Sequence, residues 1–265
     1  MALLSHKIEM DLNNKQATYC AKGCGTARFV YNWALAEWQK QYDAWKQDKT
    51  LPKPSEAALR RQLNAIKREQ YPWMAEVTKC APQLAIMNLG EAFKNFFAKR
   101  AKYPTRKRKG VHDSFQVSND QFDVDGHALR LPKLGWVRLR EPLRYSGRLM
   151  SATVSRCADR WFVSITVDVE LSFLPHENQG AAGIDLGVST LATLSTGEKV
   201  EGPKAYRRLL LRMQRLSRSL SRKQKGSANR RKAKMELARL HARIANIRSD
   251  ATHTISTYCY TSRCH

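Results

Sequence analysis

The apolar residues of this sequence change their spacing twice, and each change limits how the chain can fold. From Thr26 to Phe97 they recur at steps of three and four, which predicts amphipathic helices. From Ser114 to Glu170 the step is two, which is typical of strands with one buried face. After Gly202-Pro203 the helical spacing returns. We therefore predict an α+β protein with a β region between two helical ones.

The first helical region predicts a module of about 90 residues, within ordinary domain size. Asn13 or Asn14 can cap a short helix that Gly23 and Gly25 are expected to end. Longer helices are expected over residues 26–47, after a capping Ser55, and around Pro82. Their aromatic side chains are interpreted as core rather than as platforms that stack on bases.

The β region predicts short strands separated by glycines that suit turns. The expected strands are 114–118, 121–124, 128–131, 136–140, 149–157 and 161–170. Strands at this spacing indicate a small antiparallel sheet or barrel. A first strand over residues 2–10 is expected to return and pair here, which would make the helical module an insertion.

A second β segment is expected around Asp185. The apolar run from Ala181 ends at Gly187, and a β-favouring run over 190–195 follows, so we predict a strand, a tight turn and a strand. Asp185 is the only charge in the first of these strands, where carboxylates are depleted and costly to bury. It is therefore a candidate metal ligand or a group close to a phosphate. The alternative is an aspartate that accepts hydrogen bonds from local backbone amides.

The net charge of +24 favours a polyanionic partner, with nucleic acid first and an anionic membrane surface second. No apolar stretch approaches the roughly 20 residues that span a bilayer. The N-terminus is too short and too soon charged for a signal peptide. We expect a cytoplasmic protein without a membrane partner.

Two segments carry dense positive charge. The first is a loop with the cations Lys99, Arg100, Lys102, Arg106, Lys107, Arg108 and Lys109. In the second, from Lys204 to Arg248, sixteen Lys and Arg accompany one acid, and apolar steps of three and four predict a helical hairpin with an apolar seam. Its candidate phosphate ligands are Arg208, Arg212, Arg215, Arg218, Arg222, Lys223, Arg230, Arg231 and Lys234. A solvated basic face is the alternative in both segments, and contact with phosphates accounts better for the charge.

The six cysteines are scattered. Cys20 and Cys24 lie one helical turn apart, but no second close pair follows at the spacing of a structural zinc site. Cys259, Cys264 and His265 could in principle complete a site. We expect reduced thiols that are mostly packed.

Motifs along nearly the whole chain resemble the OrfB/TnpB family of insertion-sequence proteins, RNA-guided nucleases related to type V CRISPR effectors. The motifs are Ala27–Leu35, Tyr71–Met74, Ala92–Phe97, Lys102–Ser114, Gly183–Gly187 and Leu240–Asp250. The resemblance implies a β-barrel wedge (1–12 and 112–176), an inserted helix-turn-helix-like recognition module (13–111), and an RNase H-like (RuvC-like) domain (177–265) that includes the basic hairpin (204–250). It also implies DNA and guide RNA as partners, with nucleoid association on DNA, and it makes Asp185 the first catalytic aspartate and a Mg²⁺ ligand.

The family's later catalytic Glu, its four-cysteine zinc element and its final Asp have no counterpart here. Two-metal cleavage needs several carboxylates. The acids after Asp185 are Glu198, Glu201, Glu236 and Asp250, and none lies in a strand that resembles a ligand strand. The resemblance therefore implies a C-terminally truncated transposase or endonuclease that binds nucleic acid and is defective in cleavage.

Other interpretations stay open. The chain could be an active nuclease that borrows acids from Glu236, Asp250 or a partner chain. It could be a non-enzymatic DNA-binding regulator derived from a transposase. Residues 185–189 also resemble the phosphate loop of actin-like ATPases, but that fold needs two such lobes and leaves the basic hairpin unexplained.

Overall fold

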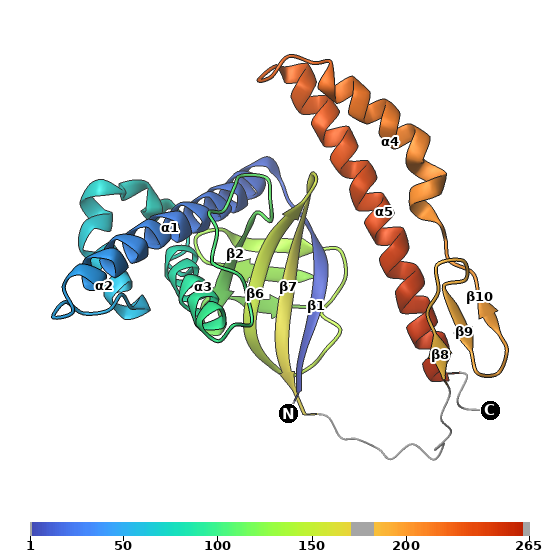
Figure 1. Ribbon diagram of the computed structural model, residues 1–265, viewed down its shortest axis with the longest axis horizontal. Helices are drawn as coiled ribbons and strands as arrows, with labels where there is room; N and C mark the ends of the chain where they lie inside the picture. The colour runs from blue at the N-terminus through green and yellow to red at the C-terminus, as the bar shows by residue number, and fades with distance from the viewer. Residues whose placement is uncertain (1, 171–182, 262–265) are drawn as a thin grey trace. The chain divides into compact units, whose positions relative to one another are not determined.

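The computed structural model describes residues 2–170 and 183–261, with side chains up to residue 257. The chain forms two compact units, residues 1–171 and 172–265, and each mixes helices and strands (Figure 1). The predicted linker over 175–180 and the two alanines that precede Gly183 lie outside the described residues. None of the described helices combines the length and the apolar character needed to cross a membrane.

The first unit is built on a seven-stranded antiparallel sheet. Its strands are β1 (Ala2–Asp11), β2 (Ser114–Ser118), β3 (Asp123–Asp125), β4 (Ala128–Leu131), β5 (Gly135–Leu139), β6 (Arg148–Cys157) and β7 (Arg160–Val169). Their order is β2-β6-β7-β1-β5-β4-β3, so β2 and β3 are its edges. The described strands thus form an antiparallel sheet, as predicted, but their pairing does not close it into a barrel. β3 starts later than predicted because residues 119–121 form a 3-10 turn, η2.

The N-terminal strand β1 lies inside the sheet between β7 and β5. It pairs with β7 from Ala2 opposite Val169 to Met10 opposite Trp161. Alternate side chains of β1, among them Ile8, are buried, while their neighbours face solvent. The predicted return of the first strand is confirmed.

The helices between β1 and β2 are α1 (Asn14–Gln47), α2 (Glu56–Gln70), the 3-10 helix η1 (Pro72–Glu76) and α3 (Cys80–Phe97). Asn13 caps α1 in a reciprocal capping box with Gln16, and the Ser55 hydroxyl accepts the Ala58 N–H at the start of α2 (3.3 Å). The prediction that Gly23 and Gly25 end a helix is wrong, because α1 runs through both.

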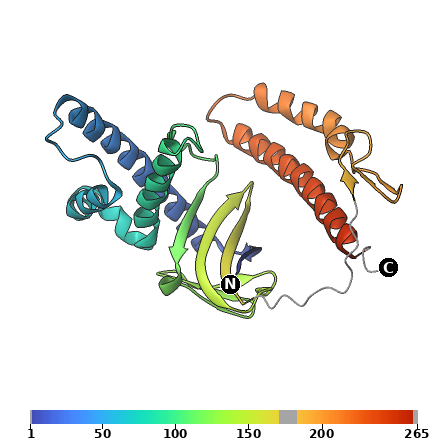
Figure 2. The same cartoon turned by 60° about the horizontal axis from the view of Figure 1, so that its bottom comes forward.

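Gly23 lies inside α1 at a position that contacts a residue far away in the sequence. A Cβ at this position would lie 2.8 Å from Cε1 of the Phe115 ring, which comes from β2. Glycine costs a helix interior about 1 kcal/mol relative to alanine, and here it allows the helix to approach the sheet closely. α1 and α3 both pack beside β2 (Figure 2).

The aromatic residues of the helices divide into two groups. Trp38 stacks on Phe93 with ring centroids 4.3 Å apart, and Phe93 is fully buried, as predicted for core residues. Phe29 and Trp73 instead reach the surface and meet edge to face with their centroids 5.3 Å apart. The core interpretation therefore holds for the first pair, and for other helical aromatics such as Tyr31, but not for the second pair.

The second unit has a small antiparallel sheet of β8 (Ile184–Asp185), β9 (Ala192–Leu194) and β10 (Lys199–Val200), followed by α4 (Ala205–Ser221) and α5 (Ala228–Thr261). Leu209, Met213 and Leu216 of α4 pack on Leu240 and Ile244 of α5. This confirms the helical hairpin and its apolar seam, although α5 continues well beyond residue 250.

Candidate nucleic-acid interface

Asp185 lies on β8, an edge strand of the small sheet, and its side chain is exposed. It stands opposite Thr193, and Thr193 stands opposite Lys199 on the next strand. Directly opposed residues of antiparallel strands share one face, so the row across the sheet is Asp185, Thr193, Lys199. A carboxylate in a strand is costly to bury. That cost does not arise, because the carboxylate faces solvent.

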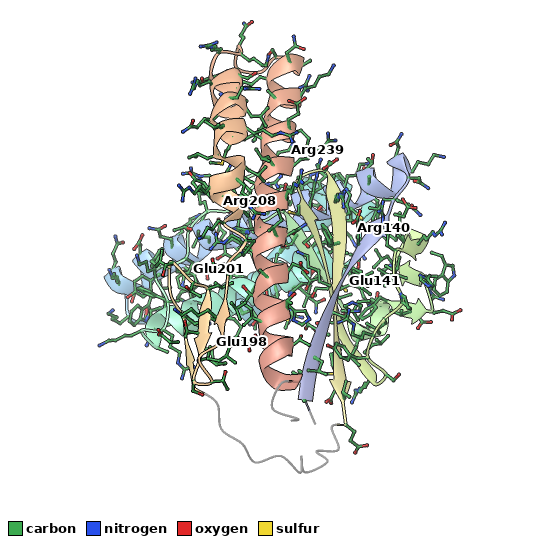
Figure 3. The ribbon with its side chains drawn as sticks, turned by 90° about the vertical axis from the view of Figure 1, so that its right-hand side faces the viewer. Arg140, Glu141, Glu198, Glu201, Arg208 and Arg239 are labelled. Atoms are coloured by element: carbon green, nitrogen blue, oxygen red, sulfur yellow. The ribbon has the colours of Figure 1, made fainter. Side chains whose placement is uncertain are left out.

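The acids that could join Asp185 around a metal ion are not assembled with it. Glu198 and Glu201 flank β10 (Figure 3), and Glu201 pairs with Lys204 at 3.6 Å. Glu236 and Asp250 belong to α5. Over residues 2–170 and 183–257, no three His, Cys, Asp or Glu side chains come together in a way that could hold a metal ion. The described donors therefore do not fit a two-metal Mg²⁺ centre, which needs several carboxylates.

The buried cysteines pack inside the first unit. Cys20 and Cys24 are buried in the first unit, and burial raises the pKa of each thiol to about 12. The thiol of Cys80 lies 3.3 Å from the Ser118 hydroxyl, whereas Cys157 is exposed. All four are free thiols, as expected. The side chains of Cys259, Cys264 and His265 lie outside the described part of the chain.

The basic hairpin presents most of its predicted cations to solvent. Arg208, Arg212, Arg215, Arg218, Arg222, Arg231 and Lys234 are exposed. Figure 3 shows Arg208 on α4 and Arg239 on α5. A groove of about 270 Å³ between the helices is lined by Arg212, Arg239 and Arg243 together with Glu236. Such a concentration of guanidinium groups suits a phosphate.

Arg239 and Arg243 are not among the phosphate ligands predicted from the sequence. They lie four residues apart and hence on one side of α5, a spacing that could have identified them. Their proximity to Arg212 depends on how the two helices pair, which the local sequence does not specify.

Arg230 has a role inside the hairpin. Its guanidinium donates hydrogen bonds to the carbonyls of Leu220 (2.8 Å) and Lys223 (2.7 Å). Leu220 belongs to the last turn of α4, and Lys223 lies just after its end. The Ser227 hydroxyl accepts the Arg230 N–H (3.1 Å) at the start of α5. Arg230 therefore closes the turn, and both Arg230 and Lys223 are only partly exposed.

The basic loop over residues 99–109 also exposes all seven of its predicted cations. Lys107 differs from the others, since its ammonium lies 4.3 Å from the centre of the Tyr31 ring and desolvation lowers the pKa of this lysine. The side chain is exposed overall while its charged end rests on an aromatic face. Lys107 thus anchors the loop, a role that its place in a basic run does not reveal.

Two family models match the chain. OrfB_IS605, described as a probable transposase, matches residues 164–262, and HTH_OrfB_IS605, described as a helix-turn-helix domain, matches residues 1–47. Over the second range the described structure consists of β1 and the single helix α1.

Curated relatives match over almost the whole chain. InsQ from Escherichia coli K12, provisionally named an RNA-guided DNA endonuclease, is 34% identical over 257 residues, which are 96% of this chain and 63% of that protein. A protein of the same provisional name from Streptomyces pristinaespiralis is 39% identical over 251 residues, 92% of this chain and 61% of that protein. The chain thus spans a little over three fifths of the length of these relatives.

Among solved structures, the chain is similar to one in a Cas12f1–sgRNA–target DNA complex, at 12% identity and a TM-score of 0.45, over 89% of this chain and 60% of that chain. A similarity at this level does not support a conclusion about fold or function. The family models and the curated relatives agree with one another and with the motifs. The chain belongs to the OrfB/TnpB family of insertion-sequence proteins.

Proposed function

We propose that this chain is a transposon-encoded nucleic-acid-binding protein of the RNA-guided DNA endonuclease type, with guide RNA and DNA as its partners. On its own it binds polynucleotide without cutting it. We also propose the finer architecture that the family implies: a wedge domain built on the open β1–β7 sheet, and a RuvC-like fold for the second unit.

The basic hairpin is the observation that carries the proposal. Sixteen Lys and Arg against one acid between residues 204 and 248 would repel one another in an isolated protein, and the apolar seam uses none of them. Exposed guanidinium groups can neutralise backbone phosphates and release counterions from them. Contacts of this kind position a nucleic acid without reading its sequence, so the sequence specificity would come from the guide RNA.

Asp185 is the proposed site of the first catalytic aspartate and Mg²⁺ ligand. Its neighbours across the sheet are a threonine and a lysine, so the row offers no second carboxylate. This placement supports the proposed cleavage defect. Incubation of the purified chain with its guide RNA, Mg²⁺ and guide-matched DNA should leave the DNA intact. Cutting that is lost on Asp185→Ala would contradict the defect.

The binding proposal is tested by replacing Arg212, Arg215 and Arg218 with glutamine. The affinity should fall for every sequence, and the slope of log affinity against log salt should become shallower by about 0.7–0.9 for each phosphate that the protein no longer neutralises. A control with the same charge change replaces Arg61, Arg130 and Arg138, which are exposed in the first unit. Equal losses in both triple variants would show that only net charge matters.

A DNA-binding regulator is the alternative function, and it is favoured by the helix-turn-helix match over residues 1–47. Removal of all co-purified RNA distinguishes an RNA-guided protein from such a regulator. If DNA affinity and selectivity are unchanged without RNA, the regulator explains the protein better.

A further inference from the structure

The basic loop between α3 and β2 has no helix or strand over residues 102–108, yet it is fixed to the first unit at several points. At its start Tyr103 packs edge to face on Phe93 and Phe96, with ring centroids 5.6 and 5.3 Å away. Pro104, the next residue, is buried. The loop therefore leaves α3 in a defined direction.

Asn32 of α1 holds the middle of the loop. Its side-chain carbonyl accepts the Lys107 N–H (2.8 Å), and its amide donates to the Lys107 carbonyl (2.9 Å). Both backbone groups of one loop residue are thus bound by one side chain. Lys107 adds its contact with the Tyr31 ring, one residue before Asn32 on the same helix.

Asp113 holds the end of the loop. One carboxylate oxygen accepts a hydrogen bond from the Arg28 guanidinium (2.9 Å), and the other accepts the Gly110 N–H (3.0 Å). The side chains of Asp113 and Arg28 are only 16% and 23% exposed. Gly110 has φ 79°, in the region that favours glycine, so the carboxylate closes a tight turn.

The remaining loop cations take no part in these anchors. Arg100, Lys102, Arg106, Arg108 and Lys109 are exposed, and within the described residues none of them pairs with a carboxylate. The only acid of the segment, Asp113, is turned inward to Arg28 and Gly110. The backbone is held in place while the charges are left for a partner.

We propose that residues 99–113 are a preformed strap for the sugar–phosphate backbone of a nucleic acid, with Asn32 and Asp113 as positioning residues. This inference rests on the proposed function and deepens it. A binding site that is already ordered does not have to be ordered on binding. The strap is accordingly held by the neutral Asn32 and the negative Asp113, which position it without touching the nucleic acid.

Asp113→Asn tests the proposal, because general electrostatics and loss of the anchor predict opposite changes in binding affinity. The variant is more positive by one charge, so electrostatics alone predicts tighter binding. Loss of the anchor predicts weaker binding by about threefold to tenfold, the factor that ordering one or two side chains costs. Asp125→Asn, an exposed aspartate of β3, is the matched control and should bind as tightly as the unchanged chain or more tightly.

Asn32→Ala is the second variant, and it changes no charge. It should weaken binding by a similar factor, whereas Asn64→Ala, at an exposed position of α2, should not. The affinities are measured by fluorescence anisotropy with full-length protein, using labelled RNA and duplex DNA of mixed sequence in separate experiments. Tryptophan fluorescence checks folding, and if Asp113→Asn fails to fold, Asn32→Ala decides.

A double-mutant cycle separates positioning from general stability. Arg108→Gln should cost less affinity in the Asn32→Ala background than in the unchanged chain, because Arg108 is then no longer held in place. Additive losses would overturn the inference, as would Asp113→Asn binding as tightly as Asp125→Asn. In those cases steep salt dependence of the unchanged chain would leave the proposed function standing. If the unchanged chain binds neither nucleic acid, the proposed function itself fails.

Discussion

Alanine at Gly23 and at Gly25 should have opposite effects on stability, although the two positions lie two residues apart in α1. Alanine in place of glycine in a helix interior stabilises it by about 0.5–1 kcal/mol. At Gly25 a new Cβ would find only the Arg28 guanidinium, 3.9 Å away. Gly25→Ala should therefore show the full gain.

At Gly23 the same gain is opposed by a steric clash. The new Cβ would lie 2.8 and 2.9 Å from two carbons of the Phe115 ring, which is only 2% exposed. Overpacking of this kind costs about 1–3 kcal/mol, so Gly23→Ala should lose about 1 kcal/mol net. For a unit of 171 residues, each change should shift Tm by about 2–4 °C, in opposite directions.

Tryptophan fluorescence during thermal and urea unfolding measures this difference without interference from the second unit. All six tryptophans (Trp33, Trp38, Trp45, Trp73, Trp136 and Trp161) belong to the first unit. If Gly23→Ala raises Tm as much as Gly25→Ala does, the close approach of α1 to β2 is not a real constraint and the reasoning is refuted.

Two further predictions concern the hairpin and the buried thiols. Arg230→Gln should destabilise the end of α4 by about 1–3 kcal/mol, because two carbonyls lose a charged donor. Amide hydrogen exchange over residues 217–225 should then become faster. Arg231→Gln, at an exposed position, is the control and should leave the exchange rates unchanged. Cys20 and Cys24 stay protonated in the folded state up to their raised pKa of about 12, whereas in the unfolded chain the same thiols ionise above their ordinary value of 9.0. The stability of the first unit should therefore fall from about pH 9 to 12, by up to about 1.4 kcal/mol per pH unit for each thiol, and urea midpoints that stay constant over this range would contradict the burial of the two thiols.

Periodicity alone located the elements whose side chains alternate between core and solvent. The strand β4 and both helices of the hairpin follow from that alternation, because one buried face imposes a fixed step on the sequence. The apolar contact between α4 and α5 could be predicted for the same reason.

The errors arose where the deciding partner is distant in the sequence. Gly23 looks like a helix breaker until Phe115 is placed against it. Arg230 looks like any other cation of a basic helix until the carbonyls of Leu220 and Lys223 are within its reach. The exposure of Asp185 depends on what packs on its face of the small sheet, and whether a sheet closes depends on its two edge strands. Local patterns cannot specify such relations.

The central position of β1 has a consequence for how the protein is made. The ribosome synthesises this strand before the helices, yet its main partner, β7, is made only after all of α1, α2 and α3. Until residues 160–169 emerge, the helices have only part of a sheet to pack on, and their apolar faces depend on a late, long-range pairing. A nascent chain arrested before β7 should therefore hold chaperones at its helices, and release should coincide with completion of the seventh strand.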